Sequence, residues 1–344
     1  MKYLWLHSIR TYIRFGLFCY YKSFRVYNTQ HVPKNKPVLF LANHQNALID
    51  PLLIATKSGR FSYFLTRASV FKKPLVSKFL HSLQMLPVYR IRDGWSNISN
   101  NNSIFSTCTE LLHQHKAIVI FPEGSHHINK TVRPLSKGFT RIVFETLEKY
   151  PDIDLQLIPV GINFKQSEAF VDRTALFFGK PLDAKAYLQK DRNKAVIALK
   201  QDVQEAISKL TTHIPNDNYE ETFKKLEQHH VDYLNPEAVN TCIQTNFETC
   251  KVGVKPKFNP FKPLVKYILL INFILPFLIW RHVIIPKIKE IEFKATFRFA
   301  IYVTLFPIWF FAITLILGAF FGWQVALGYA LSITVLSLLY VKVF

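Results

Sequence analysis

Cysteine is scarce in this chain of 344 residues, which contains only four. Cys19, Cys108, Cys242 and Cys250 show no paired close spacing, which argues against a disulfide framework. We therefore expect all four to be reduced and buried, as in a domain that faces the cytosol.

Acidic residues are also few, 23 against 43 lysines and arginines, and the formal net charge is +20. Because 49% of the residues are hydrophobic, a basic chain of this kind suits an anionic surface, either nucleic acid or anionic lipid. The sequence has no RNP, helix-turn-helix or zinc-finger pattern, so we expect no nucleic-acid partner. Membrane phospholipid is the predicted surface.

Two further motifs are missing. No Gly-x-Ser-x-Gly sequence occurs, so the nucleophile elbow of serine hydrolases is absent. Residues 1–27 lack the uninterrupted apolar stretch and small-residue cleavage site of a secretory signal. Instead they mix aromatic and basic residues at helical spacing, which predicts a helix lying in the membrane interface. The alternative is an N-terminal helix packed on the core.

The most informative stretch runs from residue 38 to 51. Residues 38–42 are continuously apolar and predict a buried strand that ends before Asn43-His44. Asp50-Pro51 then resembles a helix start, with Asp50 as N-cap and Pro51 in the first turn. A neutral imidazole can take a proton from a hydroxyl, and a carboxylate on its other nitrogen can fix the tautomer. The alternative is a histidine that only caps a loop.

Further apolar runs end in polar turns. Residues 118–120 lead into Phe121-Pro122-Glu123-Gly124-Ser125, residues 86–89 lead to Arg90 and Arg92, and residues 157–162 contain Pro159. Strands alternating with helical patterns predict an α/β fold, with a mostly parallel sheet flanked by helices. The carboxyl ends of such strands meet at one edge, so His44, Arg90 and Glu123 should share one site.

These four segments, in this order, resemble the four motifs of the glycerophospholipid acyltransferase family, over roughly residues 30–185. Asn43, His44 and Asp50 match the first motif, Arg90 the second, residues 121–125 the third and residues 158–161 the fourth. The family usually places four residues between His and Asp, whereas this chain has five, as in some glycerol-3-phosphate acyltransferases. The family also usually continues the third motif with Arg, where this chain has His126. His126, Arg133 or Lys137 would then supply the cation.

The resemblance implies a role for each matching residue. His44 would deprotonate the acceptor hydroxyl and Asp50 would orient it, while Arg90 and Arg92 would bind a phosphate. Asn43, Glu123, Gly124, Ser125 and Lys137 would line the substrate pocket, although Lys137 could equally be an ordinary surface residue. No cofactor and no metal are expected, because the acyl donor, acyl-CoA or acyl carrier protein, is a substrate. His113 and His115 are two residues apart and do not share a helical face.

We divide the chain into residues 1–27 (interface helix), 28–185 (acyltransferase core), 186–257 (peripheral helical region) and 258–344 (membrane region). Residues 299–321 and 325–341 are predicted transmembrane helices joined at Gly322, and residues 267–280 are predicted to be re-entrant or interfacial. Three full spans are the alternative. The catalytic domain should face the cytoplasm, at a bacterial inner membrane or its equivalent.

The predicted function is a membrane O-acyltransferase of phospholipid biosynthesis. Its acceptor would be 1-acylglycerol-3-phosphate (lysophosphatidate). Glycerol-3-phosphate or another lysolipid or aminolipid is the first alternative. A non-catalytic phospholipid-binding membrane protein is the second.

Overall fold

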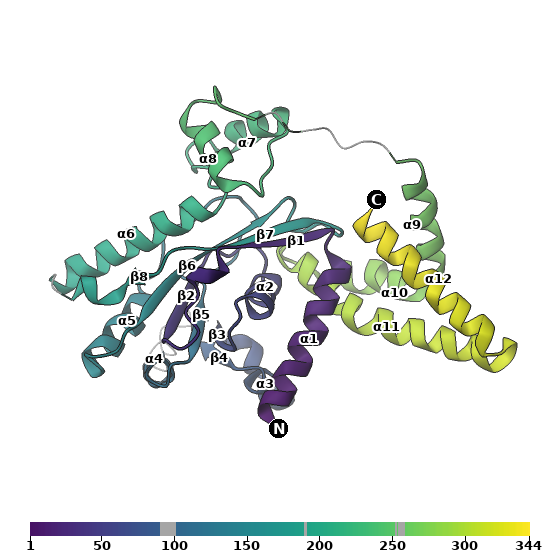
Figure 1. Ribbon diagram of the computed structural model, residues 1–344, viewed down its shortest axis with the longest axis horizontal. Coiled ribbons are helices and arrows are strands. Elements are labelled where there is room, and N and C mark those ends of the chain that lie inside the picture. Colours follow the sequence, from purple (N-terminus) through teal and green to yellow (C-terminus); the bar gives the residue numbers. More distant parts are fainter. Residues whose placement is uncertain (90–100, 189–190, 252, 254–258) are drawn as a thin grey trace.

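The computed structural model describes residues 1–89, 101–188, 191–251, 253 and 259–344. Within these ranges the strands form an eight-stranded sheet with the order β1-β7-β6-β2-β5-β3-β4, and β8 pairs with β6 (Figure 1). All pairings are parallel except those of β6 with β7 and β8, which confirms the predicted mostly parallel sheet. The strands are β1 (Ser23–Tyr27), β2 (Val38–Ala42), β3 (Ser62–Arg67), β4 (Met85–Val88), β5 (Ala117–Ile120), β6 (Gln156–Phe164), β7 (Arg173–Phe178) and β8 (Leu182–Asp183).

Helices cover both faces of the sheet. The α-helices of the described residues are α1 (Lys2–Tyr20), α2 (Ile49–Lys57), α3 (Pro74–Ser82), α4 (Asn101–His113), α5 (Gly138–Lys149), α6 (Arg192–Leu210), α7 (Tyr219–Gln228), α8 (Pro236–Gln244), α9 (Phe261–Asn272), α10 (Ile274–Leu278), α11 (Phe293–Phe321) and α12 (Trp323–Lys342). Short 3₁₀ or π segments occupy Thr29–His31, Ala68–Phe71, Ala184–Tyr187, Ile279–Ile284 and Ile285–Lys287.

Strand β2 lies at the centre of two cores. Successive side chains of a strand point to opposite faces. Leu39 and Leu41 therefore pack with α4, α5 and α6, whereas Phe40 packs with α1, α2 and α11. Every residue of β2 is buried, so the strand is a continuous apolar run rather than an alternating one.

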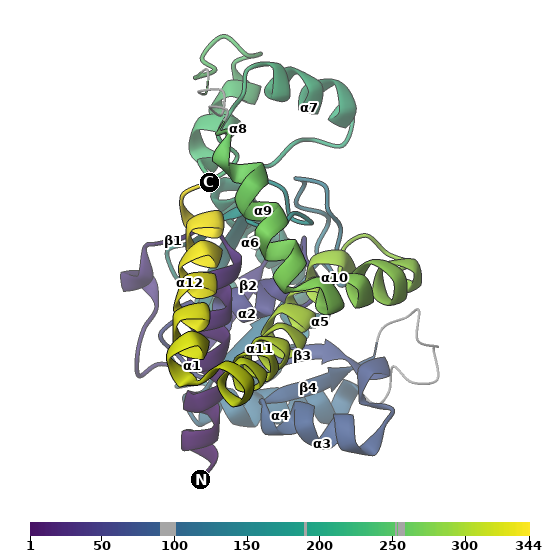
Figure 2. The same cartoon turned by 90° about the vertical axis from the view of Figure 1, so that its right-hand side faces the viewer.

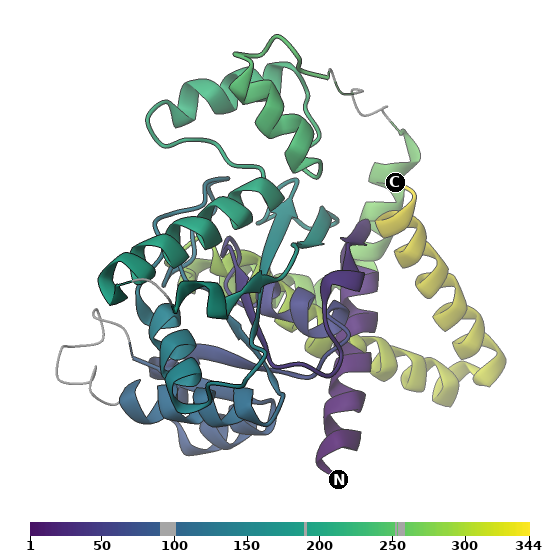
Figure 3. The same cartoon turned by 60° about the vertical axis from the view of Figure 1, so that its left-hand side comes forward.

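Helix α6 belongs to the core of the sheet, whereas α7 and α8 form a small lobe of their own (Figure 3). The lobe contains the disulfide Cys242–Cys250, so the prediction of four reduced cysteines is wrong for this pair. Asn246 and Phe247 adopt positive φ angles after α8, and this turn brings the two Cα atoms to 4.7 Å. The cysteine content therefore no longer argues for a cytosol-facing domain. Cys19 and Cys108 are unpaired cysteines.

Two C-terminal helices, α11 and α12, are long and apolar enough to cross a membrane. They form a hairpin that turns at Gly322, where φ is 86°. Before them, α9 and the segment from Ile274 to Lys287 bend by 94° at their junction, which makes this pair a broken span or a re-entrant loop.

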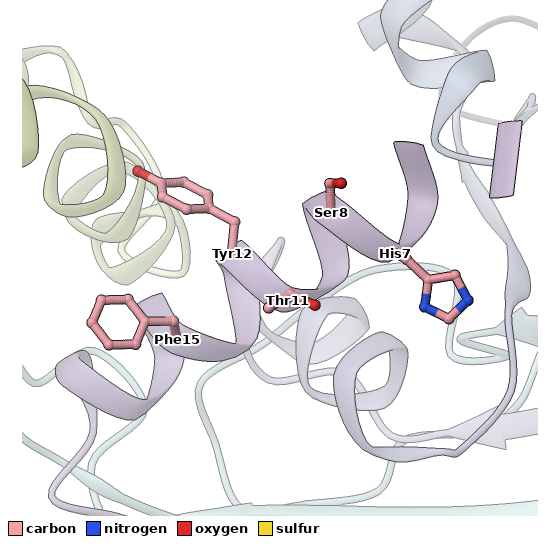
Figure 4. Close-up of a pocket in the computed structure, with 5 residues that line it drawn as sticks. All are labelled: His7, Ser8, Thr11, Tyr12 and Phe15. Carbon is pink, nitrogen blue, oxygen red and sulfur yellow. The ribbon is translucent and has the colours of Figure 1, made fainter. Parts of the chain in front are cut away.

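Helix α1 packs against α2, α11 and α12 through one face (Figure 2). This is the alternative given above, an N-terminal helix packed on the core. Leu17 and Tyr20 are buried, while Leu4 and Phe15 are exposed. A shallow depression on α1 is lined by His7, Ser8, Thr11, Tyr12 and Phe15, and Tyr12 points from it toward α11 (Figure 4). Contact of the exposed face with lipid stays a prediction.

Candidate active site

The site forms where the neighbouring parallel strands β2 and β5 end. Leu41 of β2 pairs with Ile120 of β5, so the turns that follow both strands leave the same edge of the sheet. These turns carry His44 and Glu123, and the His127 amide donates a hydrogen bond to the His44 carbonyl (3.1 Å). The predicted first and third motifs therefore lie in contact.

His44 and Asp50 form a close pair. Nδ1 of His44 lies 2.8 Å from Oδ2 of Asp50, and the same oxygen accepts the backbone N–H groups of Gln45 (2.8 Å) and Asn46 (2.7 Å). A carboxylate only accepts hydrogen bonds, so Nδ1 carries the hydrogen and Nε2 presents a lone pair. Nε2 makes no hydrogen bond within the described part of the chain, and the His44 side chain is 13% exposed.

The turn between the two residues absorbs the unusual spacing. Helix α2 begins at Ile49, two residues earlier than predicted, so Asp50 lies in its first turn and is not the N-cap. Its carboxylate reaches back to the turn that precedes the helix. Complete burial raises the pKa of Asp50, and the hydrogen bond from His44 opposes that rise.

The ring of His44 is held between aromatic side chains. It stacks on Phe121 with 4.0 Å between ring centroids, and it meets His126 edge to face at 5.5 Å. These contacts limit rotation of the imidazole, in addition to the bond at Nδ1. His126, the residue that replaces the usual Arg, thus lies beside His44.

Glu123 connects the two motifs. Its Oε1 accepts the backbone N–H of His44 (3.3 Å), and its Oε2 accepts Nε–H of Arg133 (2.7 Å). Arg133 also donates to the hydroxyl (2.8 Å) and the carbonyl of Ser125. Burial raises the pKa of Glu123, and Arg133 opposes this. Arg133, one of the three cations considered from the sequence, therefore lies at the third motif and is paired there with Glu123.

The remaining predicted residues fall into three groups. Asn43 is buried, and its amide exchanges hydrogen bonds with the main chain of Ile162 in β6 (3.0 and 2.7 Å), so it joins two strands, and its predicted contact with substrate stays a prediction. Lys137 is exposed at the N-cap of α5, and Gly124 adopts a φ of 74° in the turn after β5. Arg90 and Arg92 lie outside the described residues, so their role stays a prediction.

The fourth motif is not at a strand end, as the sequence suggested, but inside the nine-residue strand β6. A Cβ atom at Gly161 would overlap the carbonyl of Leu210, so glycine lets the end of α6 pass close to this strand. His113, which was excluded as a metal ligand, stacks on Tyr150.

One residue near the site was missed altogether. Thr296 of α11 accepts a hydrogen bond from the backbone N–H of Leu48, in the turn between His44 and Asp50 (3.0 Å). The two residues are separated by 248 positions, and no local sequence signal could have paired them.

Comparison with known proteins adds to this geometry. Residues 23–163 match the model of the family described as Acyltransferase. An uncharacterized acyltransferase of Schizosaccharomyces pombe is 33% identical over 104 residues, which cover 29% of this chain and 15% of that protein. Glycerol-3-phosphate O-acyltransferase 1 of Saccharomyces cerevisiae is 20% identical over 263 residues, covering 52% of this chain and 35% of that protein. The chain thus spans about a third or less of the length of these relatives.

Among solved structures, the 1-acyl-sn-glycerophosphate (LPA) acyltransferase PlsC of Thermotoga maritima superimposes with a TM-score of 0.43 and 18% identity, covering 60% of this chain and 79% of that chain.

Proposed function

We propose that this chain, whose residues 23–163 match the acyltransferase family model, transfers a fatty acyl group from an acyl thioester to the hydroxyl of a glycerophosphate-type acceptor. The observation that carries the proposal is the His44–Asp50 pair at the edge where two parallel strands end. Such a pair suits the removal of a proton from a hydroxyl.

The proposed reaction needs no acyl-enzyme. Nε2 of His44 takes the proton as the acceptor oxygen attacks the thioester carbonyl, forming a C–O bond. Collapse of the tetrahedral intermediate breaks the C–S bond, and the imidazolium returns the proton to the departing thiolate. Asp50 holds Nδ1–H throughout and stabilises the positive charge that His44 carries between the two steps.

The phosphate of the acceptor requires a cation. We assign this contact to Arg90, with Arg92 and Lys137 as further candidates, because Arg133 is already paired with Glu123. Glu123 supports the His44 backbone, and Gly124 and Ser125 shape the same turn.

The acceptor is 1-acylglycerol-3-phosphate or glycerol-3-phosphate. The five-residue interval between His44 and Asp50, and the name of the Saccharomyces cerevisiae relative, glycerol-3-phosphate O-acyltransferase 1, support glycerol-3-phosphate as the second candidate acceptor. Acyl-CoA and acyl carrier protein are the candidate donors. A lyso-aminolipid acceptor and a non-catalytic lipid-binding protein remain as alternatives.

Purified full-length protein in lipid nanodiscs tests the proposal. Thiol release and acylated product are measured with acyl-CoA or acyl carrier protein against glycerol-3-phosphate, 1-acylglycerol-3-phosphate and a lyso-aminolipid. We expect turnover with a phosphorylated acceptor, and we expect His44→Ala to reduce kcat by roughly 10²–10⁴-fold.

His113→Ala is the matched control, because this ring stacks on Tyr150 and takes no part in the proposed chemistry. Its activity should stay near that of the wild type. Absence of acyl transfer to every acceptor would leave the lipid-binding alternative, and an active His44→Ala variant would contradict the mechanism.

A further inference from the structure

The first turns of α11 lie against the active site, although they begin a helix long and apolar enough to cross a membrane. Phe293 meets His126 edge to face at 4.8 Å between ring centroids, and His126 in turn meets His44. Arg67, at the end of β3, stands over the ring of Phe293 at 5.5 Å. The start of α11 therefore forms a wall beside the proposed general base.

A direct polar link joins this wall to the turn between His44 and Asp50. The hydroxyl of Thr296 accepts the backbone N–H of Leu48 at 3.0 Å, and Thr296 is only 9% exposed. The same turn places the amides of Gln45 and Asn46 on the Asp50 carboxylate. One α11 side chain thus supports the segment that sets the distance between base and carboxylate.

The position of Thr296 is itself firmly held. Its neighbours Ala295 and Phe299 are fully buried in the core that contains α2. Arg298 donates to the hydroxyl of Tyr20 (2.9 Å) and to the carbonyl of Glu168. Contacts on both sides of Thr296 therefore prevent α11 from shifting independently of the catalytic core.

We propose that Thr296 is a positioning residue for the active site, and that docking of the C-terminal hairpin is required for the His44–Asp50 turn to hold its reactive geometry. The expected effect on kcat rests on the proposed acyl transfer. The support of the His44–Asp50 turn by Thr296 does not depend on that proposal. Thr296 contacts the turn and not the reacting atoms, so its loss should act on kcat more than on either KM.

The test compares Thr296→Val, Thr296→Ser and Thr304→Val in the full chain in nanodiscs. Thr304 is the matched control, because its hydroxyl bonds to Ala300 within the same helix. We expect Thr296→Val to lower kcat by about tenfold or more, with each KM within about twofold. Thr296→Ser keeps the hydroxyl and should restore kcat, whereas Thr304→Val should match the wild type.

Hydrogen-exchange mass spectrometry gives a readout independent of activity. The peptide containing Leu48 should exchange faster in Thr296→Val than in the wild type, and unchanged in Thr304→Val. Unchanged exchange, or an equal kcat loss in Thr296→Ser and Thr296→Val, would overturn the inference. If the Leu48 peptide of Thr296→Val exchanges faster but the wild type shows no acyl transfer, the proposed function is overturned. The contact between Thr296 and the His44–Asp50 turn would still be supported. Thermal midpoints separate these outcomes from general unfolding.

Discussion

His44 and Asp50 illustrate how much a local pattern can predict at the scale of single residues. A strand ending before a histidine, followed by a helix start with an acidic residue, left open a histidine that only caps a loop. Together with the resemblance to the acyltransferase motifs, it predicted the pair that lies 2.8 Å apart. The pattern could not show that Asn43 points into the interior, because an amide suits both a substrate and a neighbouring strand. Asn43 is 3% exposed, and its side chain bonds to Ile162 of β6, 119 positions later.

We expect Asp50→Asn to reduce kcat by roughly 10²–10⁴-fold, because an amide cannot stabilise the imidazolium as a carboxylate does. The variant should fold, since an amide oxygen can still accept the N–H groups of Gln45 and Asn46. Steady-state kinetics and a thermal melt measure the two effects. Activity within a few-fold of the wild type would show that another carboxylate partners His44.

Arg133 offers a stability prediction at the same scale. Its partner Glu123 has a side chain only 2% exposed, so Arg133→Met would leave a buried carboxylate unpaired. Breaking such a pair costs about 3–5 kcal/mol, and we expect the lower end because Arg133 is 25% exposed. Arg141→Met breaks the more exposed Arg141–Glu145 pair and should cost about 0–1 kcal/mol.

The stability lost in Arg133→Met should depend on pH in a definite direction. The pKa of Glu123 is already raised by burial, and removal of Arg133 raises it further. A folded state with a raised carboxyl pKa binds more protons than the unfolded state, so its stability falls as pH rises between the two pKa values. The loss in free energy of unfolding caused by Arg133→Met should therefore be smaller at about pH 5 than at pH 8. This loss should be absent from the double variant Arg133→Met/Glu123→Gln, which lacks the buried carboxyl. A loss of stability that does not depend on pH would show that it comes from the lost packing of the Arg133 side chain.

At the scale of elements, continuous apolar runs predicted the buried strands at 38–42 and 118–120 correctly. The fourth motif was predicted at a strand end, whereas β6 continues through Pro159 to Phe164. Proline lacks only the N–H group, and its carbonyl still accepts the Gly179 amide (2.8 Å). The approach of α6 to Gly161 depends on the packed fold and leaves no local signal.

We expect Gly161→Ala to destabilise the protein by about 1–3 kcal/mol, because the added methyl meets the main chain of Leu210, which cannot move as a side chain can. Gly328→Ala is the control, since a Cβ there meets nothing within 4 Å. Thermal unfolding in nanodiscs measures both. An unfolding midpoint unchanged by Gly161→Ala would show that α6 can move away from the added methyl without loss of stability.

At the scale of the whole molecule, composition predicted the C-terminal hairpin, but not where its ends lie. Thr296 near the start of α11 contacts Leu48, and Lys342 at the end of α12 donates to the carbonyl of Tyr21 (2.7 Å). Both ends of the hairpin therefore touch the catalytic core. Contacts between residues about 250–320 positions apart follow from the packed fold, and a local pattern carries no trace of them.

These contacts bear on the number of spans. If α9 and the segment to Lys287 formed a full crossing, Lys287 and the catalytic core would lie on opposite sides of the bilayer. Thr296 follows soon after Lys287 in the chain and yet bonds to the catalytic turn. The 94° bend of this segment also suits an element that enters and leaves on one side. We therefore propose two spans, with α9 and α10 re-entrant or interfacial.

The direction of insertion follows from charge. Lys287, Lys289, Lys294 and Arg298 flank the start of α11 and Lys342 the end of α12, while Gly322-Trp323-Gln324 at the tip is uncharged. From the positive-inside tendency we propose that both basic flanks, and with them the catalytic core, lie in the cytoplasm. With all four native cysteines replaced, single cysteines at positions 289, 323 and 344 are treated in intact cells with a membrane-impermeant thiol reagent. Only position 323 should react, because the tip alone reaches the outer face. Reaction at 289 and 344 but not at 323 would contradict the proposed topology, because both basic flanks would then lie outside. A further single cysteine at the exposed core position 209 separates the two causes. Without reaction at 209 the chain has three spans and α11 cannot dock on the core, whereas reaction at 209 means that the orientation of the whole protein is reversed.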